Sequence, residues 1–523
     1  MENLRPSEEY KFSLNVDDID QSLFKIFWKP IENDEIQFEL HCRATGWIGF
    51  GLSPNGGMAG SDIAIGWVDS NGQSYLKDTY ATSKSTPLVD DEQNWDLLDA
   101  SEQDGYTILK IKRKLITCDQ GNDYDIKLET QRLIFAWSDQ DPETGDNDWS
   151  YHGANRKIKS AILLNFQDET SQIPDSEIND VHEIHLNNHP IPYKDTYYYC
   201  KLFSLPPLER DLHLLSYDIL IDKESLDFVH HLVVYICKPE DLEKINKISN
   251  LGYECGPGGI EEFELNALKG VCEARTLIVS WAVGGQTNIS LPENTGFRFP
   301  KSDRETLVFV DFHFDNSRLL KNRNVNTGFR FKFTRNLKKY DLGVLAMSVR
   351  TNPLDITIPP NTDLIKMSSV CFSDCTQTFL PEDGITVFGG NFHTHLAGRA
   401  LRTHLIRDGK LVKYLFDDQH YDFNYQSNIL IQPTKLMKGD ALILDCVYNS
   451  TNIRNNTKIL VNHLKTKVKS SKELSNRYKH YYANPTNVSA YCSIKTRKNG
   501  LFFEKELLRP KENLIEENYC DRF

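Results

Sequence analysis

The chain has 523 residues, a formal charge of −14, and a composition that is 39% hydrophobic and 26% charged. This length suggests about three domains, and the composition is that of a globular protein able to bury several cores. The acidic balance argues against nucleic acid as a partner, because phosphate binding requires a basic surface. No apolar run could cross a bilayer. The first residues lack the apolar core of a secretory signal, so either the protein is cytosolic or the sequence begins downstream of its true start.

Short strand-like runs follow one another along the whole chain. They are β-branched and aromatic, often alternate in polarity, and are bounded by Gly, Asn, Asp or Pro. They comprise residues 24–30, 36–44, 48–53, 63–69, 306–314, 328–334, 386–396 and 441–448. Because sustained helical periodicity is scarce between them, the pattern predicts an all-β protein built from antiparallel β-sandwiches.

Composition also predicts the boundaries between modules. Residues 166–195 are polar, lack periodicity and contain three prolines, so we expect a linker there. A second, weaker boundary falls near residues 350–360, and the charged residues after Cys492 are expected at the surface. The predicted modules are therefore residues 10–165, 196–350 and 351–497, with a tail at 498–523.

Eleven cysteines and four glycosylation sequons bear on the cellular compartment. The cysteines show no Cys-x-x-Cys spacing, and we favour disulfides over reduced core thiols. Their odd number leaves at least one thiol without an intrachain partner. The sequons are typical of a glycoprotein, but an Asn-rich chain of this length would contain about as many by chance. They lie at Asn288, Asn449, Asn455 and Asn487.

Three histidine motifs are candidate metal sites. His393 and His395 in NFHTHLAG would project together if they lie in a strand. His230 and His231 in FVHHLVVYIC are adjacent, so a shared metal requires an irregular strand or an open, T-shaped geometry. His313 lies in the run LVFVDFHFDN. Each motif alone is more often structural, but the three together predict a site suited to copper or zinc.

These motifs, in this order, resemble the copper motifs of the dopamine β-hydroxylase-like copper type II, ascorbate-dependent monooxygenases. The stretch GWIGFGLSPNGGMAGSDIAIGWVD resembles a DOMON domain, the sandwich that precedes the copper domains in the dopamine β-hydroxylase branch. The resemblance covers nearly the whole chain. It implies a DOMON domain at residues 10–165 and two jelly-roll-like copper domains at 196–350 and 351–497.

The resemblance also implies the copper ligands. His230, His231 and His313 would bind an electron-transfer copper, and His393 and His395 would bind an oxygen-activating copper. The two centres would be separate and would face a common cleft. Ascorbate would supply electrons, and O2 would hydroxylate a C–H of a small substrate, such as a dopamine-like or tyramine-like aromatic amine.

Two further residues carry family-based expectations. A family tyrosine near the first disulfide falls on Tyr198 in TYYYC, which makes Tyr198 a catalytic candidate together with His393; the alternative is a core tyrosine beside a disulfide. The family's methionine ligand falls on Leu474, counted back from His480 in KHYYANP. Leucine cannot ligate copper. Met437 and His463 are conceivable substitutes that no matching context supports.

The departure at Leu474 leaves two functions open. One is an active monooxygenase; the other is a secreted binding protein that has kept copper but lost oxygen chemistry. The resemblance places either protein in the secretory pathway or outside the cell.

The resemblance implies three disulfides, Cys200–Cys255, Cys237–Cys272 and Cys371–Cys492. It also leaves Cys446 unpaired, because the family's partner position is Ser475. Cys520 either pairs with Cys375 or matches cysteines that link subunits in the family, so a homo-oligomer is left open.

Overall fold

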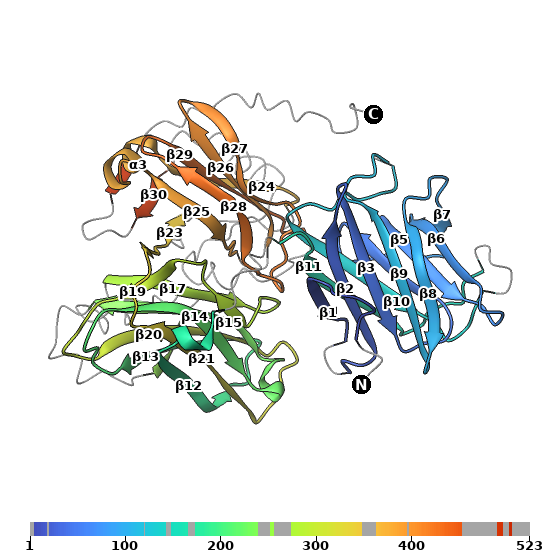
Figure 1. Ribbon diagram of the computed structural model, residues 1–523, viewed down its shortest axis with the longest axis horizontal. Coiled ribbons are helices and arrows are strands. Elements are labelled where there is room, and N and C mark those ends of the chain that lie inside the picture. Colours follow the sequence, from blue (N-terminus) through green and yellow to red (C-terminus); the bar gives the residue numbers. More distant parts are fainter. Residues whose placement is uncertain are drawn as a thin grey trace, which may run out of the picture. The chain divides into compact units, whose positions relative to one another are not determined.

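The computed structural model describes residues 5–17, 20–119, 121–142, 148–165, 173–238, 252–255, 274–347, 362–394, 397–451, 489–494 and 501–504. Most described elements are β-strands, as the sequence predicts (Figure 1). The chain forms two compact units: the first includes Met1–Asn165 and Asp417–Asp422, and the second includes Phe166–Phe416 and Phe423–Pro510.

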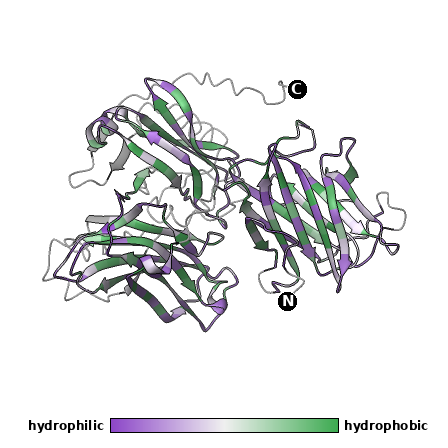
Figure 2. Ribbon diagram, viewed as in Figure 1, coloured by the Kyte–Doolittle hydropathy of each residue, from purple (hydrophilic) through white to green (hydrophobic). Residues whose placement is uncertain are grey.

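The first unit contains two antiparallel sheets. One has the order β1 (Phe12–Asn15), β2 (Phe24–Ile31), β3 (Glu35–Cys42), β9 (Tyr106–Lys114) and β8 (Asp96–Gln103). The other has the order β11 (Arg156–Ile162), β10 (Thr130–Trp137), β4 (Ile48–Ser53), β5 (Ser61–Val68), β6 (Ser74–Ala81) and β7 (Leu88–Val89). A continuous apolar core includes Phe24, Phe38, Phe50 and Phe135. Alternating hydrophobic and hydrophilic bands along the strands in Figure 2 reflect the period of two that puts one face inward.

Asp78 on β6 is a buried carboxylate in this unit. It is 1% exposed and clusters with Asp62 and Asp123, while Arg113 forms an ion pair with Asp62 at 2.5 Å. Burial, together with the negative charge of Asp62, raises the pKa of Asp78 to about 8. An unfolded Asp ionises near pH 4. The folded unit therefore loses stability as the pH rises from about 4 to about 8, because only the unfolded chain releases this proton.

We accordingly predict that Asp78→Asn stabilises the first unit by about 2 kcal/mol at pH 7 and has little effect at pH 4. Asparagine cannot ionise, and its side-chain oxygen can still accept the backbone N–H of Asn94, as Oδ2 of Asp78 does at 2.8 Å. Calorimetric melting of both proteins at the two pH values measures the effect. A lower melting temperature for Asp78→Asn at pH 7 would show instead that the fold uses the negative charge.

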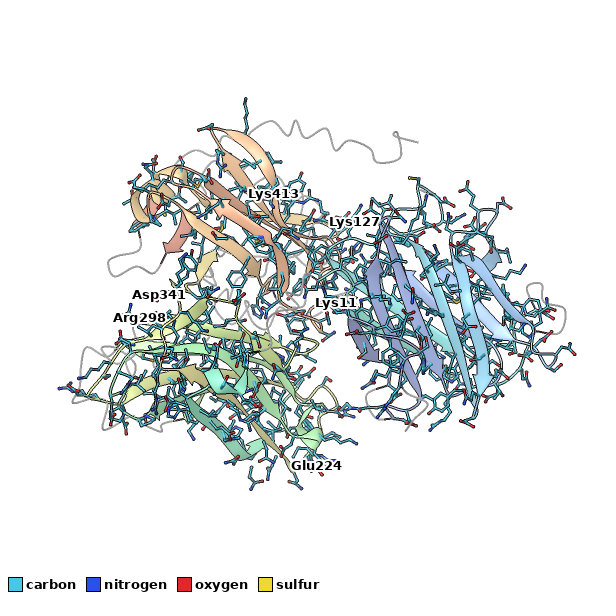
Figure 3. All side chains as sticks on the ribbon, viewed as in Figure 1. Lys11, Lys127, Glu224, Arg298, Asp341 and Lys413 are labelled. Atoms are coloured by element: carbon cyan, nitrogen blue, oxygen red, sulfur yellow. A yellow bond between two sulfur atoms is a disulfide. The ribbon has the colours of Figure 1, made fainter. Side chains whose placement is uncertain are left out.

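The first sandwich of the second unit also has two sheets. One has the order β12 (Asp180–Ile191), β21 (Arg323–Thr334), β14 (Leu212–Ile221), β19 (Thr295–Phe299) and β22 (Tyr340–Asp341), and β18 (Asn288–Ser290) also pairs with β14. The other has the order β16 (Gly252–Cys255), β13 (Thr196–Leu205), β20 (Thr306–Asp315), β15 (Val229–Lys238) and β17 (Ala274–Ala282). Phe312, Phe314, Phe329 and Phe331 are fully buried in its core. Charged side chains lie outside it, such as Arg298 and Asp341, which are 3.5 Å apart (Figure 3).

The predicted linker at residues 166–195 needs correction, because β12 lies within it. β12 pairs with β21 over most of its length. Ile184 and Leu186 are buried, whereas Glu183 and His185 face solvent. This short alternation is the pattern of an edge strand, and the flanking prolines and polar residues masked it in the sequence.

The remaining described strands of the second unit form three smaller sheets. One has the order β24 (Ile365–Cys371), β29 (Ala441–Tyr448), β26 (Gly398–Arg407) and β27 (Lys410–Asp418). The second pairs β25 (Ile385–Gly390) with β28 (Ile429–Leu436). The third has the order β23 (Leu345–Met347), β30 (Ser489–Ile494) and β31 (Leu501–Glu504). β31 falls in the predicted tail. Its sequence LFFE begins with three apolar residues, a composition that permits a strand. The described helices are short: α3 (Ser373–Phe379), η2 (Asp175–Glu177) and η3 (Lys223–Ser225). No helix among the described residues is long and apolar enough to span a membrane.

The disulfide Cys200–Cys255 is present, which confirms that pairing. Cys237 and Cys371 are also disulfide-bonded, but their predicted partners, Cys272 and Cys492, lie outside the side chains that the structure describes. Cys446 is a buried free thiol, as expected.

Candidate metal centre

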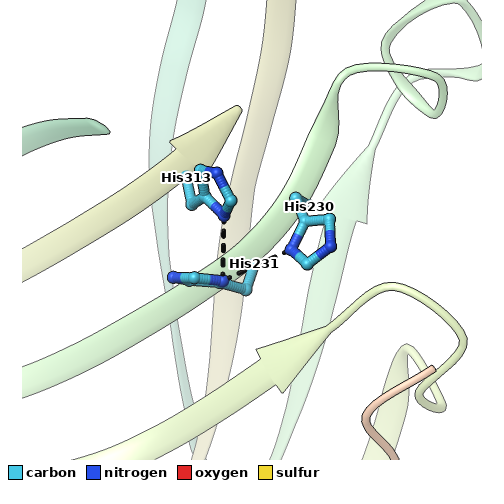
Figure 4. A group of neighbouring side chains, drawn as sticks. All are labelled: His230, His231 and His313. Atoms are coloured by element: carbon cyan, nitrogen blue, oxygen red, sulfur yellow. Dashed lines mark hydrogen bonds between the residues drawn. The ribbon is translucent and has the colours of Figure 1, made fainter. Parts of the chain in front are cut away.

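Three of the predicted histidines converge in the second unit. His230 and His231 lie on β15, and His313 lies directly opposite His231 on the neighbouring strand β20. The Nδ1 atom of His231 is 3.4 Å from Nδ1 of His230 and 3.2 Å from Nδ1 of His313. The rings therefore point their Nδ1 atoms toward a common point (Figure 4). Residues more than eighty positions apart in the chain thus form one cluster.

An irregularity in β15 allows the two adjacent histidines to share this cluster. Neighbouring side chains of a regular strand point to opposite faces. Here the pairing with β20 shifts register between Val229 and His231, so His230 occupies a β-bulge. The bulge turns the His230 ring to the same side as His231. An irregular strand of the kind that a shared metal would require is therefore present at these two histidines.

The three histidines of this cluster are buried, and burial favours the neutral form of His230. His230, His231 and His313 are 4%, 5% and 3% exposed. Desolvation, with a smaller contribution from His393, lowers the pKa of His230 to about 4. Neutral imidazoles offer lone pairs, which metal binding requires. Nε2 of His230 is also buried without a hydrogen-bond partner among the described residues.

The spacing of the Nδ1 atoms fits one metal ion. Two nitrogens each about 2.0 Å from an ion, at roughly tetrahedral angles, lie about 3.3 Å apart. The observed separations are 3.2 and 3.4 Å. Three imidazoles without a carboxylate suit copper or zinc rather than magnesium or calcium. The residues present therefore fit a copper ion.

Two residues of β13 support His313. Tyr198 stacks on its ring, with centroids 4.2 Å apart and planes within 1°. The hydroxyl of Thr196 lies 2.7 Å from Nε2 of His313. A proton on Nε2 would make this hydrogen bond and leave the Nδ1 lone pair for a metal. Thr196 was missed in the sequence, although it lies two residues before Tyr198 and so shares its strand face.

His393 lies beyond the end of a strand, which corrects the expectation for the FHTHL motif. Strand β25 ends at Gly390, and no secondary structure is assigned to residues 391–394. A Cβ at Gly390 would lie 2.7 Å from the ring of Phe416, so a larger residue here would require Phe416 to move. The His393 side chain is exposed to solvent. Its pKa is nevertheless lowered, because protein atoms surround the ring and limit the water that would solvate an imidazolium.

The structure brings His393 to the three-histidine cluster. Its ring centroid is 5.2 Å from that of His231, at an interplanar angle of 85°. Phe423 stacks on His230 in the same region, with centroids 4.4 Å apart. One ring of the second predicted ligand set thus lies against a ring of the first. His395 lies outside the described residues.

No thioether lies near His393 among the described residues that the sequence singled out. Leu474 and His463 lie outside the described residues. Met437 directly follows β28. Its sulfur lies close to Gly384, the residue before β25. Since Ile385 pairs with Leu436 and Gly390 with Ile429, Met437 lies at the opposite end of this strand pair from His393. Strands of this length span about 17 Å, so Met437 does not replace the missing ligand here.

Comparison with known proteins is consistent with these sites. Residues 20–138 match the DOMON domain, residues 182–321 match the N-terminal domain of copper type II ascorbate-dependent monooxygenases, and residues 340–503 match the C-terminal domain. The chain is 32% identical over 434 residues to "DBH-like monooxygenase protein 1" of Gallus gallus, covering 82% of this chain and 67% of that protein.

Two further relatives also match most of this chain. The Homo sapiens protein of the same name is 32% identical over 80% of this chain and 65% of its own length. "Dopamine beta-hydroxylase" of Canis lupus familiaris is 28% identical over 90% of this chain and 71% of its own length. The chain thus spans about two thirds of the length of these relatives. It belongs to the dopamine β-hydroxylase-like copper type II, ascorbate-dependent monooxygenases, a family of oxidoreductases.

Proposed function

We propose that this chain uses copper, ascorbate and O2 to hydroxylate a C–H bond of a small molecule, of the dopamine or tyramine class of aromatic amines. The observation that carries the proposal is the convergence of three buried Nδ1 atoms from His230, His231 and His313. One oxygen atom would enter the substrate, and the other would leave as water with two electrons and two protons from ascorbate.

The two histidine sets would have different tasks. His230, His231 and His313 would hold the electron-transfer copper, since three buried imidazoles can bind both oxidation states of copper. His393 and His395 would hold the oxygen-activating copper. Copper would supply one-electron transfer and activation of O2. Tyr198 would cover His313 and exclude water from one side, while the exposed ring of His393 would leave room for O2 and substrate.

A second candidate function is a catalytically impaired, secreted copper-binding protein, and the residue that favours it is Leu474. A thioether stabilises Cu(I) and an alkyl group does not. Two histidines can still retain copper at this site, so the loss would weaken rather than abolish binding.

Copper analysis and ascorbate-dependent O2 uptake with tyramine and dopamine would separate the two functions, with Leu474→Met as the comparison. We expect two coppers per chain and slow hydroxylation, and we expect Leu474→Met to raise both Cu(I) affinity and turnover at least about tenfold. One copper per chain and no O2 uptake by either protein would reject the monooxygenase. Two coppers with product from the unchanged chain would reject the binding protein.

We also propose that the protein resides in the secretory pathway or outside the cell. The disulfide Cys200–Cys255 supports this, because such bonds persist in oxidising compartments. The sequons at Asn288 and Asn449 are compatible with glycosylation there. The proposed partners are the small substrate and O2; a homo-oligomer is compatible with the odd number of cysteines.

A further inference from the structure

Gln426 lies three residues before β28 and contacts His393. Gln426 is only 3% exposed. Its Oε1 lies 2.7 Å from Nδ1 of His393, and its Nε2 donates a hydrogen bond to the backbone carbonyl of Phe423 at 2.7 Å. A buried amide with both ends engaged has one orientation.

These two contacts fix the tautomer of His393. The carbonyl of Phe423 can only accept, so the NH2 end of the Gln426 amide must face it. The amide oxygen must then face His393 and accept from its Nδ1. His393 therefore carries a proton on Nδ1 and has its lone pair on Nε2. In this tautomer Nε2 of His393, and not Nδ1, is the nitrogen that offers a lone pair to a metal.

Hydrogen bonds to its backbone hold Gln426 in place. Its backbone N–H donates to the carbonyl of Val283 at 3.3 Å, and the N–H of Val283 donates to the carbonyl of His230 at 2.7 Å. The side chain of Asn391 donates to the carbonyl of Gln426 at 3.5 Å. Gln426 therefore connects His393, through hydrogen bonds, with the strand that carries His230.

We propose that Gln426 is a positioning residue that selects Nε2 of His393 as the metal-binding atom and fixes the direction of this ring. The inference rests on the proposed function, because it concerns the ligand of the oxygen-side copper. It concerns the orientation and the tautomer of the His393 ring.

The test compares Gln426→Leu with Gln426→Glu in the full chain. Leucine has a similar size but neither accepts from Nδ1 nor donates to Phe423. Glutamate loses the donor but keeps an acceptor for Nδ1–H. We measure copper stoichiometry, Cu(I) affinity by competition with a chelator, and the Cu(II) EPR spectrum. The matched control is Gln432→Leu, because Gln432 is an exposed glutamine on β28.

Gln426→Leu is expected to weaken Cu(I) binding at one site by 10- to 100-fold, about the effect of removing the partner of a metal-bound histidine, and to alter one component of the EPR spectrum. Gln426→Glu should largely restore both, and Gln432→Leu should resemble the unchanged chain. Equal affinity and spectrum for Gln426→Leu and the unchanged chain would overturn this inference, and so would equal losses in the Leu and Glu variants. Failure of the unchanged chain to bind copper would overturn the proposed function instead.

Discussion

Replacing His313 with alanine is expected to remove one copper per chain and to lower ascorbate-dependent turnover by at least about 100-fold. His313 supplies one of three converging Nδ1 atoms, 3.2 Å from that of His231. Two histidines would remain, with an unfilled space where the third ring stacked on Tyr198. A proposed electron-transfer site with two imidazoles would hold copper more weakly in both oxidation states.

The matched control for this variant is His185→Ala. His185 is an exposed histidine on β12 in the same sandwich and pairs with Glu183. Its loss should leave both copper content and turnover unchanged. Copper analysis after dialysis and O2 uptake give the two readouts. If His313→Ala retained the copper content and turnover of the unchanged chain, the three-histidine cluster would not be a copper site.

Replacing Cys255 with serine is expected to destabilise the second unit by about 4 kcal/mol. The disulfide Cys200–Cys255 closes a loop with a sequence separation of 55, and the chain-entropy model gives about this value for such a loop. The bond also ties β16 to β13, where Cys255 lies opposite Tyr198. We therefore expect Cys255→Ser to lower copper retention as well as the melting temperature.

Calorimetric melting without reductant measures this loss, with Cys446→Ala as the control. Cys446 is a buried cysteine of the same unit that forms no disulfide, so its replacement removes a thiol and a little volume only. Its effect should be clearly smaller. Equal shifts for the two variants would mean that packing, and not the crosslink, accounts for the effect at Cys255.

The fold class and the histidines that converge could be predicted from the sequence because both depend on local patterns. Alternating apolar runs identified the strands, and the order of the histidine motifs identified the family. β12 was not predicted, since its alternation is short and lies between prolines, where polar composition dominates. The end of β25 before His393 was not predicted either, because the crowding at Gly390 by Phe416 arises from tertiary packing.

The partners of the ligands were the least predictable part of the site. Thr196 could have been found from its strand face, two residues from Tyr198. Gln426 carries no metal-ligand pattern, and its contact with His393 spans 33 positions of the chain. The approach of His393 to His231 likewise depends on packing between distant segments, which hydrophobic periodicity does not encode. Such residues become visible only when hydrogen bonds and ring contacts are known.

Anomalous X-ray scattering from copper-loaded crystals, measured on both sides of the copper absorption edge, tests the central claim most directly. The account predicts a copper peak about 2.0 Å from the Nδ1 atoms of His230, His231 and His313. Fully loaded crystals with copper only at other residues, and no peak among these three rings, would contradict it.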